Sequence, residues 1–524
     1  MTNSDLSRKI FHFCRQAGVQ SVIVCAGARN APLVVALQKT DFKIYHFFEE
    51  RSASFFALGL IRSFGKPVAI ITTSGTAVAE VLPAAIEATY QGLPLLILSA
   101  DRPASYRGTG APQSIEQVGL FSNYVERVYD LSVQSIDFNF KWSLQKPLHV
   151  NVCLDEPLID QSKDDDLKDV FFQQTILQKV TQQSFSEQIF DNPLVVLGEL
   201  STAEQAIVVN FIQQSKSLVY AESLSQLRQS QEIQPYLLPC SDQLIERLFR
   251  EKKLQSVIRF GRVPTLRFWR DLEKHEKTIP VLNVTDLPFS GLARFSENLN
   301  WSTFQTKYEQ KKIRIQVDES CVLEAHHLGR SIKKETQRLL QKYPQSEQSF
   351  IFQLSKLIDT FSLYLGNSLP IRHWDQFAEA CSKTIVANRG ANGIDGQVST
   401  YLGFSEGQPI SYAVVGDLTA LYDLAALGLS PQLQPNQRRL VVLNNFGGQI
   451  FSRVFKNELF INRHATQFKN WAEMWGWDYL KVQSSEQLLL LKEIKSEQMV
   501  IELQPEAEQT HLFWSEWDQI CQKI

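Results

Sequence analysis

The sequence predicts an α/β protein made of three doubly wound parallel-sheet domains. Short aliphatic and β-branched runs alternate with helix-like segments along most of the chain. Most of these runs are apolar at every position, as expected of parallel strands that helices cover on both faces. The chain has 524 residues, which is too long for one hydrophobic core, because domains usually hold roughly 150–200 residues.

A first domain is predicted over residues 1–185. It opens on the polar segment MTNSDLSRKIFHFC, which is typical of a capped helix and not of a signal peptide. Strands are expected at QSVIVCAG, KPVAIITTS, LPLLILSAD and PLHVNVCL, with helices such as ERSASFFALGLIRSFG between them. The charged stretch DQSKDDDLKD then breaks the alternation and indicates a solvated linker.

Two further α/β domains are predicted over residues 186–345 and 346–524. The central domain has the strand-like runs NPLVVLGEL, KSLVYAES, LQSVIRFG and TIPVLNV, and the last has LYLGNS, KTIVANRG, ISYAVVGD, RLVVLNN and QMVIELQP. In doubly wound sheets, ligands bind where the strands end at their carboxyl edge. The residues that directly follow these runs are therefore the first candidates for a site.

Charge and composition exclude several classes of protein. The net charge of −3 argues against a nucleic-acid-binding protein, which usually carries a basic face. The seven cysteines include no Cys-x-x-Cys pair, and several lie in apolar runs, which favours reduced core residues. No apolar run is long enough to span a bilayer, so no stable membrane insertion is expected. These features predict a cytoplasmic protein.

Two predicted strands of the last domain end in side chains that carry oxygen ligands. SYAVVGD ends on Asp417, and RLVVLNN ends on Asn444 and Asn445. A carboxylate, an amide oxygen and the carbonyl of Gly447 would leave room for waters and phosphate oxygens around an octahedral Mg²⁺. Asp417 alone is explained about equally well as the cap of a helix. The NNFGG segment after the next strand makes the metal site the favoured interpretation.

This pair resembles the diphosphate-anchoring motif of thiamine diphosphate enzymes, although Leu418 stands where the general motif has a second glycine. The resemblance predicts a glutamate in another domain that protonates the aminopyrimidine ring of the cofactor. The segment YHFFEERSASFFALG supplies Glu49 and Glu50. A carboxyl group in apolar surroundings retains its proton more readily, as this role requires. A surface acid at a helix start is the alternative.

Longer segments are closely similar to one subfamily, the 2-succinyl-5-enolpyruvyl-6-hydroxy-3-cyclohexene-1-carboxylate (SEPHCHC) synthases, or MenD family. They are KPVAIITTSGTAVAEVLPAAIEATYQGLPLLILSADRP, GAPQSIEQVGLF, GNSLPIR and ANRGANGIDGQVST. The resemblance is strong over residues 20–125 and 362–455 and weak elsewhere. It implies a pyrimidine-binding first domain, a diphosphate-binding third domain, and Glu50 as the catalytic acid. The implied cofactor contacts are Glu50, Ile394, Asp417 and Asn445, and the implied ligands of Mg²⁺ or Mn²⁺ are Asp417, Asn445 and Gly447.

The resemblance also implies the reaction and the partners. This family decarboxylates 2-oxoglutarate and adds the product carbanion to isochorismate, which yields SEPHCHC in menaquinone biosynthesis. A homodimer or a dimer of dimers is implied, because enzymes of this class build each site between two chains. Carboxylate-rich substrates call for arginines, whose planar fork pairs carboxylates bidentately. The implied substrate-binding residues are Arg29, Arg102, Gln113, Arg267, Ser368, Arg372, Arg389, Ile450 and Phe451.

Two departures and two alternatives remain. Ala28 replaces a serine that contacts substrate in the family, and Leu266 stands where a basic residue often precedes the arginine. A thiamine-dependent decarboxylase or acetolactate-type ligase would share the metal motif and Glu50, but it would need no arginine set. A non-catalytic α/β binding protein would have lost Glu50, Asp417 or Asn445, and all three are present.

Overall fold

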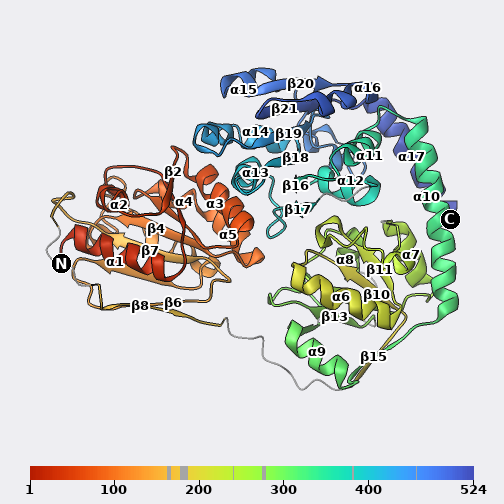
Figure 1. Cartoon of the computed structure of the whole chain (residues 1–524), viewed down its shortest axis with the longest axis horizontal. Helices are drawn as coiled ribbons and strands as arrows, with labels where there is room; N and C mark the ends of the chain where they lie inside the picture. The colour runs from red at the N-terminus through yellow and green to blue at the C-terminus, as the bar shows by residue number, and fades with distance from the viewer. Residues whose placement is uncertain are drawn as a thin grey trace. The chain divides into compact units, whose positions relative to one another are not determined.

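The computed structural model describes residues 1–161, 167–176, 187–239, 241–273, 279–294, 296–379, 383–455 and 457–523. Within these residues, helices alternate with strands, and the strands form three larger sheets and two small two-stranded ones. Every recorded strand pairing in the first two larger sheets is parallel. The predicted α/β class with parallel sheets is confirmed (Figure 1).

The first large sheet has helices on both faces. Its strands are, in spatial order, β2 (Lys43–His46), β1 (Ser21–Val24), β3 (Val68–Thr72), β4 (Leu95–Asp101), β7 (Leu148–Cys153) and β5 (Val128–Ser132). Helices α1 (Asn3–Gln16) and α2 (Ala31–Leu37) share one apolar cluster with alternate strand residues. Helix α3 (Glu50–Phe64) packs on β1 and β3, and α5 (Leu82–Gln91) packs on α3.

The strand order reverses between β1 and β3, because the chain runs from β1 to β2 on one side and returns to β3 on the other. In doubly wound folds, such a switch point opens a crevice at the carboxyl ends of the strands, where ligands bind. The turn after β1 carries Arg29, and the turn after β3 leads into α4 (Thr76–Ala79). The topology therefore places one of the predicted arginines at the switch point.

Local sequence explains where α3 begins and ends. The Glu49 side chain caps the helix by accepting hydrogen bonds from the backbone N–H groups of Arg51, at 3.0 Å, and Ser52, at 3.1 Å. The helix ends at Gly65, whose φ of 63° is the left-handed conformation that glycine adopts at low cost. Glu50 is therefore held in the first turn of a helix with two fixed ends.

Helix α3 crosses α13 (Gln397–Ser405) at two glycines. A Cβ atom added to Gly59 would lie 2.0 Å from the Thr400 carbonyl oxygen, and one added to Gly403 would lie 2.2 Å from the Phe56 carbonyl oxygen. Both atoms that a side chain would meet belong to the backbone. The two helices therefore pack at backbone contact distance, which only glycine permits at these positions.

The second large sheet is also covered on both faces. Its strands are, in order, β11 (Leu218–Ala221), β10 (Pro193–Leu197), β12 (Ser256–Phe260), β13 (Val281–Val284) and β14 (Glu297–Leu299). Along β10, Leu194 and Val196 belong to one apolar cluster, while Val195 and Leu197 belong to another. Alternate residues of the strand thus point into two different apolar clusters, and neither face of the sheet is polar, as in a doubly wound fold. The helices near it are α6 (Thr202–Ser215), α7 (Asp242–Arg250), α8 (Arg267–Asp271) and α9 (Trp301–Glu309).

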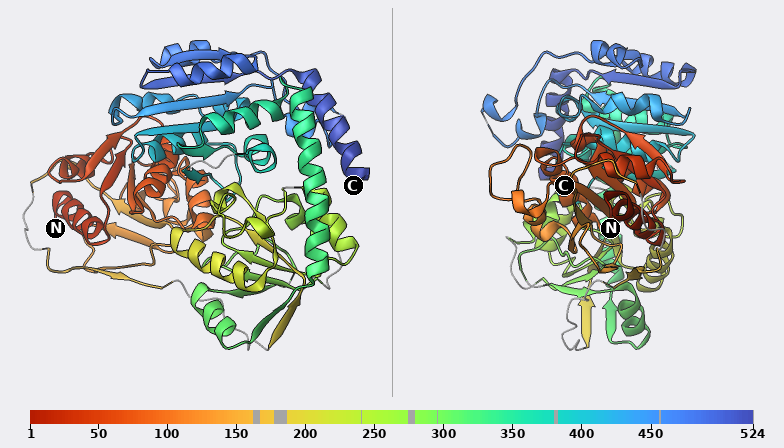
Figure 2. Two further views of the ribbon diagram at one scale, coloured as in Figure 1. Left: turned by 45° about the vertical axis from the view of Figure 1, so that its right-hand side comes forward. Right: turned by 90° about the vertical axis from the view of Figure 1, so that its left-hand side faces the viewer.

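Helix α10 (Glu319–Lys342) is a long helix that lies beside the C-terminal helix α17 (Ala507–Lys523), as Figure 2 shows. Ala325, Ile332 and Leu339 of α10 share a buried cluster with Phe513 and Trp517 of α17. These residues recur at helical spacing, so each helix presents one apolar stripe to the other. Helix α10, with its charge-rich residues 329–342, is thus amphipathic.

The third large sheet carries the strands of the last predicted domain. Its order is β17 (Thr384–Val386), β16 (Ser362–Leu365), β18 (Ile410–Gly416), β19 (Gln437–Leu443), β21 (Gln498–Leu503) and β20 (Asp478–Val482). The remaining strands pair in parallel as β9 (Gln188–Asp191) with β15 (Ile313–Gln316) and β6 (Phe138–Trp142) with β8 (Val170–Gln174). The helices of this part of the chain are α11 (Glu347–Leu357), α12 (Leu369–Phe377), α14 (Asp417–Tyr422), α15 (Lys469–Met474) and α16 (Ser485–Leu488).

Backbone contacts divide the chain into two compact units. One comprises Met1–Gln178, Asn388–Arg438 and Asn470–Trp477, and the other comprises Lys179–Ala387, Arg439–Lys469 and Asp478–Ile524. The predicted boundary between residues 185 and 186 lies outside the described residues, and the three predicted domain limits stay a prediction. None of the helices described here is both long and apolar enough to cross a membrane.

Candidate active site

Asp417 lies at the end of β18 and begins α14. It is 3% exposed, and its Oδ1 accepts a hydrogen bond from the backbone N–H of Leu418 at 2.7 Å. The position before it, Gly416, is the N-cap of the helix and has no side chain to cap it. Asp417 is therefore the first residue of the helix and not its N-cap, and its buried carboxylate binds a backbone N–H of the first turn.

Asn444 and Asn445 follow β19, and their amides have different surroundings. Asn444 donates from Nδ2 to Glu502 Oε1 at 2.7 Å and to the Thr466 carbonyl at 3.0 Å, and its Oδ1 accepts from the Phe446 N–H at 3.3 Å. Asn445 donates from Nδ2 to Glu347 Oε2 at 2.9 Å. Its Oδ1 is buried and accepts no hydrogen bond from the described residues. Asn445 thus keeps a buried acceptor oxygen for a ligand.

The backbone after Asn445 makes a close turn at Gly447. Its φ is 141°, and an added Cβ would lie 2.6 Å from the Ile461 carbonyl oxygen, so a side chain does not fit. The Gly447 carbonyl accepts a hydrogen bond from the Gln449 N–H at 2.8 Å, and a carbonyl oxygen has a second lone pair for a cation. A carboxylate, an amide oxygen and a backbone carbonyl are each oxygen ligands of the kind that a hard divalent cation prefers.

The two neighbouring glutamates at the start of α3 have different surroundings. Glu49 spends its carboxylate on capping the helix, and its Oε1 lies 3.6 Å from Arg51 Nε. Glu50 is half-buried, and desolvation raises the pKa of its carboxyl group, with a smaller contribution from the charges of Glu49 and Glu80. A raised pKa favours the protonated form of this carboxyl group, and the Glu49 carboxylate is engaged in capping the helix.

Arg102 follows β4 and opens a long loop that also carries Gln113. The Arg102 N–H donates to Asp101 Oδ1 at 2.8 Å, and its Nε donates to the Pro112 carbonyl at 3.0 Å. Its guanidinium lies 5.3 Å from the centre of the Tyr106 ring. Gln113 has a φ of 55° and lies against Gly75, where an added Cβ would be 3.2 Å from the Gln113 Cα.

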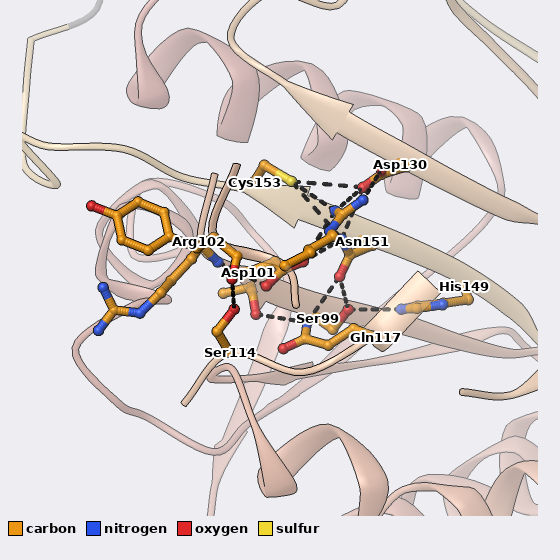
Figure 3. A network of polar contacts seen from close by, with 12 residues as sticks. Ser99, Asp101, Arg102, Ser114, Gln117, Asp130, His149, Asn151 and Cys153 are labelled. Atoms are coloured by element: carbon orange, nitrogen blue, oxygen red, sulfur yellow. Dashed lines mark hydrogen bonds and ion pairs between the residues drawn. The ribbon is translucent and has the colours of Figure 1, made fainter. Parts of the chain in front are cut away.

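A buried polar network fixes the base of this loop (Figure 3). Asn151 of β7 donates from Nδ2 to Asp101 Oδ2 at 3.0 Å and to Asp130 Oδ1 at 2.9 Å. Its Oδ1 accepts from Ser99 Oγ and from Gln117 Nε2, both at 2.9 Å. Arg102 extends away from these groups in Figure 3. Sequence reasoning missed the network, although polar residues at alternate positions of two apolar strands were a signal for it.

Arg29 lies in the turn after β1 and is mostly buried, at 13% side-chain exposure. Its Nη1 donates to the Leu154 carbonyl at 3.1 Å and lies 3.7 Å from Glu156 Oε1. The fully buried Asn30 holds the turn, because its Oδ1 accepts from the Gly27 N–H and its Nδ2 donates to the Cys25 carbonyl, each at 2.9 Å. Asn30 is a second positioning residue that sequence reasoning missed.

Arg389 and Ile394 lie on the segment that leads into α13. The buried Glu87 of α5 holds this segment by accepting from the backbone N–H groups of Gly390, at 2.8 Å, and Ala391, at 2.7 Å. A cavity of about 180 Å³ lies beside it. The residues that line the cavity are Phe55, Pro83, Ile86, Glu87, Asn388, Ala391, Gly393 and Asp395.

Arg267 and Arg372 lie near one another in the second unit. Both arginines exert an electrostatic effect on Asp242, whose pKa is raised mainly by burial and lowered in part by these two charges. Arg372 of α12 donates from Nη1 to the Thr265 carbonyl at 3.2 Å, and Arg267 begins α8 with 55% of its side chain exposed. Leu266 is buried in the core, so it does not stand in for a basic ligand.

The remaining predicted residues lie on short turns. Ser368 precedes α12 with a φ of 72° and makes no capping hydrogen bond. Ile450 and Phe451 belong to a single 3₁₀ turn, Gln449–Phe451. The structure places the predicted residues in two groups, one per unit. The first unit holds Arg29, Glu50, Arg102, Gln113, Arg389, Ile394 and Asp417, and the second holds Arg267, Ser368, Arg372, Asn445, Gly447, Ile450 and Phe451.

Known proteins are similar to nearly the whole chain. The family described as thiamine pyrophosphate enzyme, N-terminal TPP binding domain, matches residues 4–120. A 2-succinyl-5-enolpyruvyl-6-hydroxy-3-cyclohexene-1-carboxylate synthase of Bdellovibrio bacteriovorus is 41% identical, with 99% of each chain covered. Synthases of the same name are 38% identical in Akkermansia muciniphila, with 95% of each chain covered, and 30% identical in Lysinibacillus sphaericus, with 90% covered.

The similarity extends well beyond the segments that carried the resemblance. It includes the central region, where the sequence motifs were weak, because the alignments span 90–99% of this chain. With relatives at 30–41% identity over this length, the chain belongs to the 2-succinyl-5-enolpyruvyl-6-hydroxy-3-cyclohexene-1-carboxylate synthase family and is a thiamine diphosphate-dependent transferase that forms a carbon–carbon bond.

Proposed function

We propose that the protein decarboxylates 2-oxoglutarate and adds the remaining four-carbon unit to isochorismate, which yields SEPHCHC and CO₂ in menaquinone biosynthesis. The observation that carries this proposal is the arginine set, Arg29, Arg102, Arg372 and Arg389, in a chain of this family. Both substrates are dicarboxylates, and arginine pairs carboxylates through a planar fork. A decarboxylase that acts on a monocarboxylate would not need four arginines to bind its substrate.

The proposed metal site holds Mg²⁺ or Mn²⁺ through Asp417, Asn445 and the Gly447 carbonyl. The buried Oδ1 of Asn445, which accepts no hydrogen bond from the described residues, supports this assignment. When bound, thiamine diphosphate supplies the carbon nucleophile and accepts the electron pair released by decarboxylation. The protein's contribution is to hold the diphosphate through the cation and to support the cofactor with Ile394, its proposed apolar contact.

Glu50 is the proposed catalytic acid. Its half-buried carboxyl group, with a raised pKa, is suited to share a proton with a ring nitrogen of the aminopyrimidine. Glu49 is occupied in capping α3 and in contacts with Arg51, so it is not available for this proton. The proposed division of roles is that Glu49 orients the helix start and Glu50 handles the proton.

The substrate residues would hold carboxylates and exclude other molecules. Arg372 donates to the Thr265 carbonyl, two residues before Arg267, and the buried Glu222 and Asp375 accept hydrogen bonds from Leu266 and Thr265 of the same segment. Ser368, Ile450 and Phe451 are the further proposed contacts of this unit, and Arg29, Arg102, Gln113 and Arg389 are the proposed substrate-binding residues of the other. The loss of a serine at Ala28 removes one polar contact and leaves the arginines in place.

We further propose that the active protein is a homodimer or a dimer of dimers in the cytoplasm, with Glu50 supplied to each site by the neighbouring chain. Its partners are then the two small-molecule substrates and a second copy of the chain, with no nucleic acid and no stable membrane insertion. The family resemblance supports the shared site, because enzymes of this class join the two cofactor-binding domains of different chains.

Substrate preference tests the proposed reaction. Wild-type enzyme should use 2-oxoglutarate far better than pyruvate, which lacks the distal carboxylate. Arg372→Ala should lower kcat/KM by roughly ten- to a hundredfold, because a charge-assisted hydrogen bond contributes ~1.5–3 kcal/mol. Arg372→Lys should rescue poorly, since an ammonium cannot reproduce the fork. Arg314→Ala, at a half-exposed surface pair with Glu187, is the matched control and should behave as wild type.

The opposite pattern would favour the decarboxylase or acetolactate-type alternative. In that case pyruvate would be processed as well as 2-oxoglutarate, and Arg372→Ala would match Arg314→Ala. Calorimetric titration with thiamine diphosphate should give the same affinity in all three variants, so that a loss of activity can be assigned to the substrate and not to the cofactor.

A further inference from the structure

Two adjacent asparagines are each held by a buried glutamate from a distant part of the chain. Asn444 donates to Glu502 of β21, and Asn445 donates to Glu347 of α11. Glu502 is fully buried and Glu347 is 1% exposed. A buried carboxylate is costly unless it is hydrogen-bonded or paired, so each of these two side chains has a specific task in the structure.

The two asparagine amides differ in the hydrogen bonding of their carbonyl oxygens. Asn444 uses its carbonyl oxygen on the Phe446 N–H, so its whole amide is engaged within the protein. Asn445 Oδ1 is buried and accepts nothing from the described residues. The Asn444 amide is therefore fully used within the protein. The Asn445 amide is oriented by the hydrogen bond of its nitrogen, and its oxygen can accept from a ligand.

We propose that Glu347 is a positioning residue that fixes the Asn445 amide with its oxygen toward the divalent cation. The hydrogen bond from Nδ2 to Glu347 Oε2, at 2.9 Å, determines which end of the amide faces the ligand. Rotation of the amide by half a turn would offer N–H groups to a cation and leave the carboxylate facing an oxygen. The inference rests on the metal site proposed above and adds a residue that contacts neither cation nor cofactor.

Glu347 is itself held in place from three sides. It is the first residue of α11, where the N-terminal end of the helix favours a negative charge. Its backbone N–H donates to Thr510 Oγ1 at 3.0 Å. Its second oxygen, Oε1, lies 2.9 Å from Nδ1 of the buried His373 of α12. The helix start and the Thr510 contact fix the backbone of Glu347, and its carboxylate lies between Asn445 and His373.

The arrangement follows a general feature of metal sites. Groups that orient a ligand through its second polar atom change metal affinity by roughly 10–100-fold when they are removed. Glu347→Leu keeps a similar volume and removes the acceptor. Glu347→Gln keeps an oxygen that can still accept from Asn445 Nδ2. Glu502→Leu is the control for the loss of a buried carboxylate beside Asn444, whose amide oxygen is already hydrogen-bonded; it also removes the acceptor of the Phe468 N–H and of the Tyr479 hydroxyl.

The test is a titration of full-length protein with Mg²⁺ at saturating thiamine diphosphate, followed by calorimetry, with the melting temperature of the ligand-free protein measured in parallel. We expect the apparent Mg²⁺ dissociation constant to rise roughly 10–100-fold in Glu347→Leu. We expect it to stay within about threefold of wild type in Glu347→Gln and in Glu502→Leu. A lower melting temperature with unchanged Mg²⁺ affinity would indicate a purely structural role. A weaker Mg²⁺ affinity in folded protein would indicate the positioning role.

Other outcomes separate this inference from the proposed function. If wild type binds Mg²⁺ with cofactor and folded Glu347→Leu binds it equally well, the positioning role is wrong and the metal site stands. If wild type shows no Mg²⁺-dependent cofactor binding, both proposals fail. Should Glu347→Leu not fold, Glu347→Asp replaces it, because withdrawing the carboxylate by one methylene should also weaken Mg²⁺ binding at least fivefold, and an unchanged affinity would overturn the role.

Discussion

At the scale of single residues, the proposed cofactor site depends on two buried polar side chains, Asp417 and Asn445. Asp417 is almost fully buried and does not cap its helix. Asn445 Oδ1 is buried and accepts no hydrogen bond from the described residues. Removing such groups from water costs free energy, and a ligand that binds them offsets part of that cost.

Removing the charged ligand should therefore weaken cofactor binding more than it weakens the fold. We expect Asp417→Ala to raise the dissociation constant of thiamine diphosphate at fixed Mg²⁺ by tenfold or more, since hydrogen bonds and contacts to charged groups contribute ~1.5–3 kcal/mol. Isothermal titration calorimetry measures this directly. An unchanged affinity, with a melting temperature like that of wild type, would show that Asp417 is not a metal ligand.

The acid at the start of α3 gives a second prediction. Glu50→Gln should bind the cofactor with wild-type affinity and lose at least roughly a hundredfold in kcat, the usual loss when a general acid is removed. Glu49→Gln should mainly lower the melting temperature, because Glu49 caps the helix. Steady-state kinetics on both variants decides the matter, and the reverse pattern would assign the proton to Glu49.

His149, in the polar network behind Arg102, makes stability depend on pH. Burial lowers its pKa from 6.5 to about 3, so below pH 6.5 the unfolded chain binds a proton that the folded protein does not. The stabilising effect is full above pH 6.5 and is lost as the pH falls toward 3.

We expect the free energy of unfolding to drop by about 1–2 kcal/mol more in wild type than in His149→Gln between pH 7 and pH 5. Glutamine does not titrate and can still reach Ser99 Oγ, which lies 2.7 Å from His149 Nε2. Urea unfolding at the two pH values measures the difference. Equal losses in the two proteins would mean that this histidine already carries a proton in the folded state.

At the scale of elements, the crossing of α3 and α13 joins two functional segments within one unit. Helix α3 begins at Glu50, and the segment with Arg389 and Ile394 leads directly into α13. The contact needs glycine on both helices, because an added Cβ at either position would lie within 2.2 Å of backbone oxygen.

Gly403→Ala should push the helices apart and lower stability by about 1–3 kcal/mol, as overpacking does. The melting temperature should fall with it, and activity should fall in the folded protein because both segments shift. Gly119→Ala is the control, since nothing lies within 4 Å of the Cβ that it adds. If the two variants have the same melting temperature, the two helices do not pack at backbone contact distance.

The sequence predicts strands, and the residues that end them, better than it predicts what holds those residues. Continuous apolar runs identify the strands, so β18 and β19 and the positions of Asp417 and Asn445 at their ends were predictable, whereas the strand order and its switch point came from the structure. The partners were not, because they come from remote segments. Glu347 is 98 positions from Asn445, and Glu87 is 303 positions from Gly390. Only the folded chain brings such side chains together.

At the scale of the whole molecule, the sequence motifs and the similar proteins indicate the same family. Relatives at 30–41% identity span nearly all of this chain. The arginines predicted from the resemblance lie in both compact units.

The measurement that tests this account most directly is the identity of the product. Purified protein is incubated with thiamine diphosphate, Mg²⁺, 2-oxoglutarate and isochorismate, and the products are identified by mass spectrometry, with single omissions of each component as controls. The account predicts SEPHCHC and one CO₂ for each 2-oxoglutarate consumed, with no product when isochorismate, cofactor or metal is left out. Release of CO₂ with succinic semialdehyde as the sole product, or efficient turnover of pyruvate in place of 2-oxoglutarate, would contradict it.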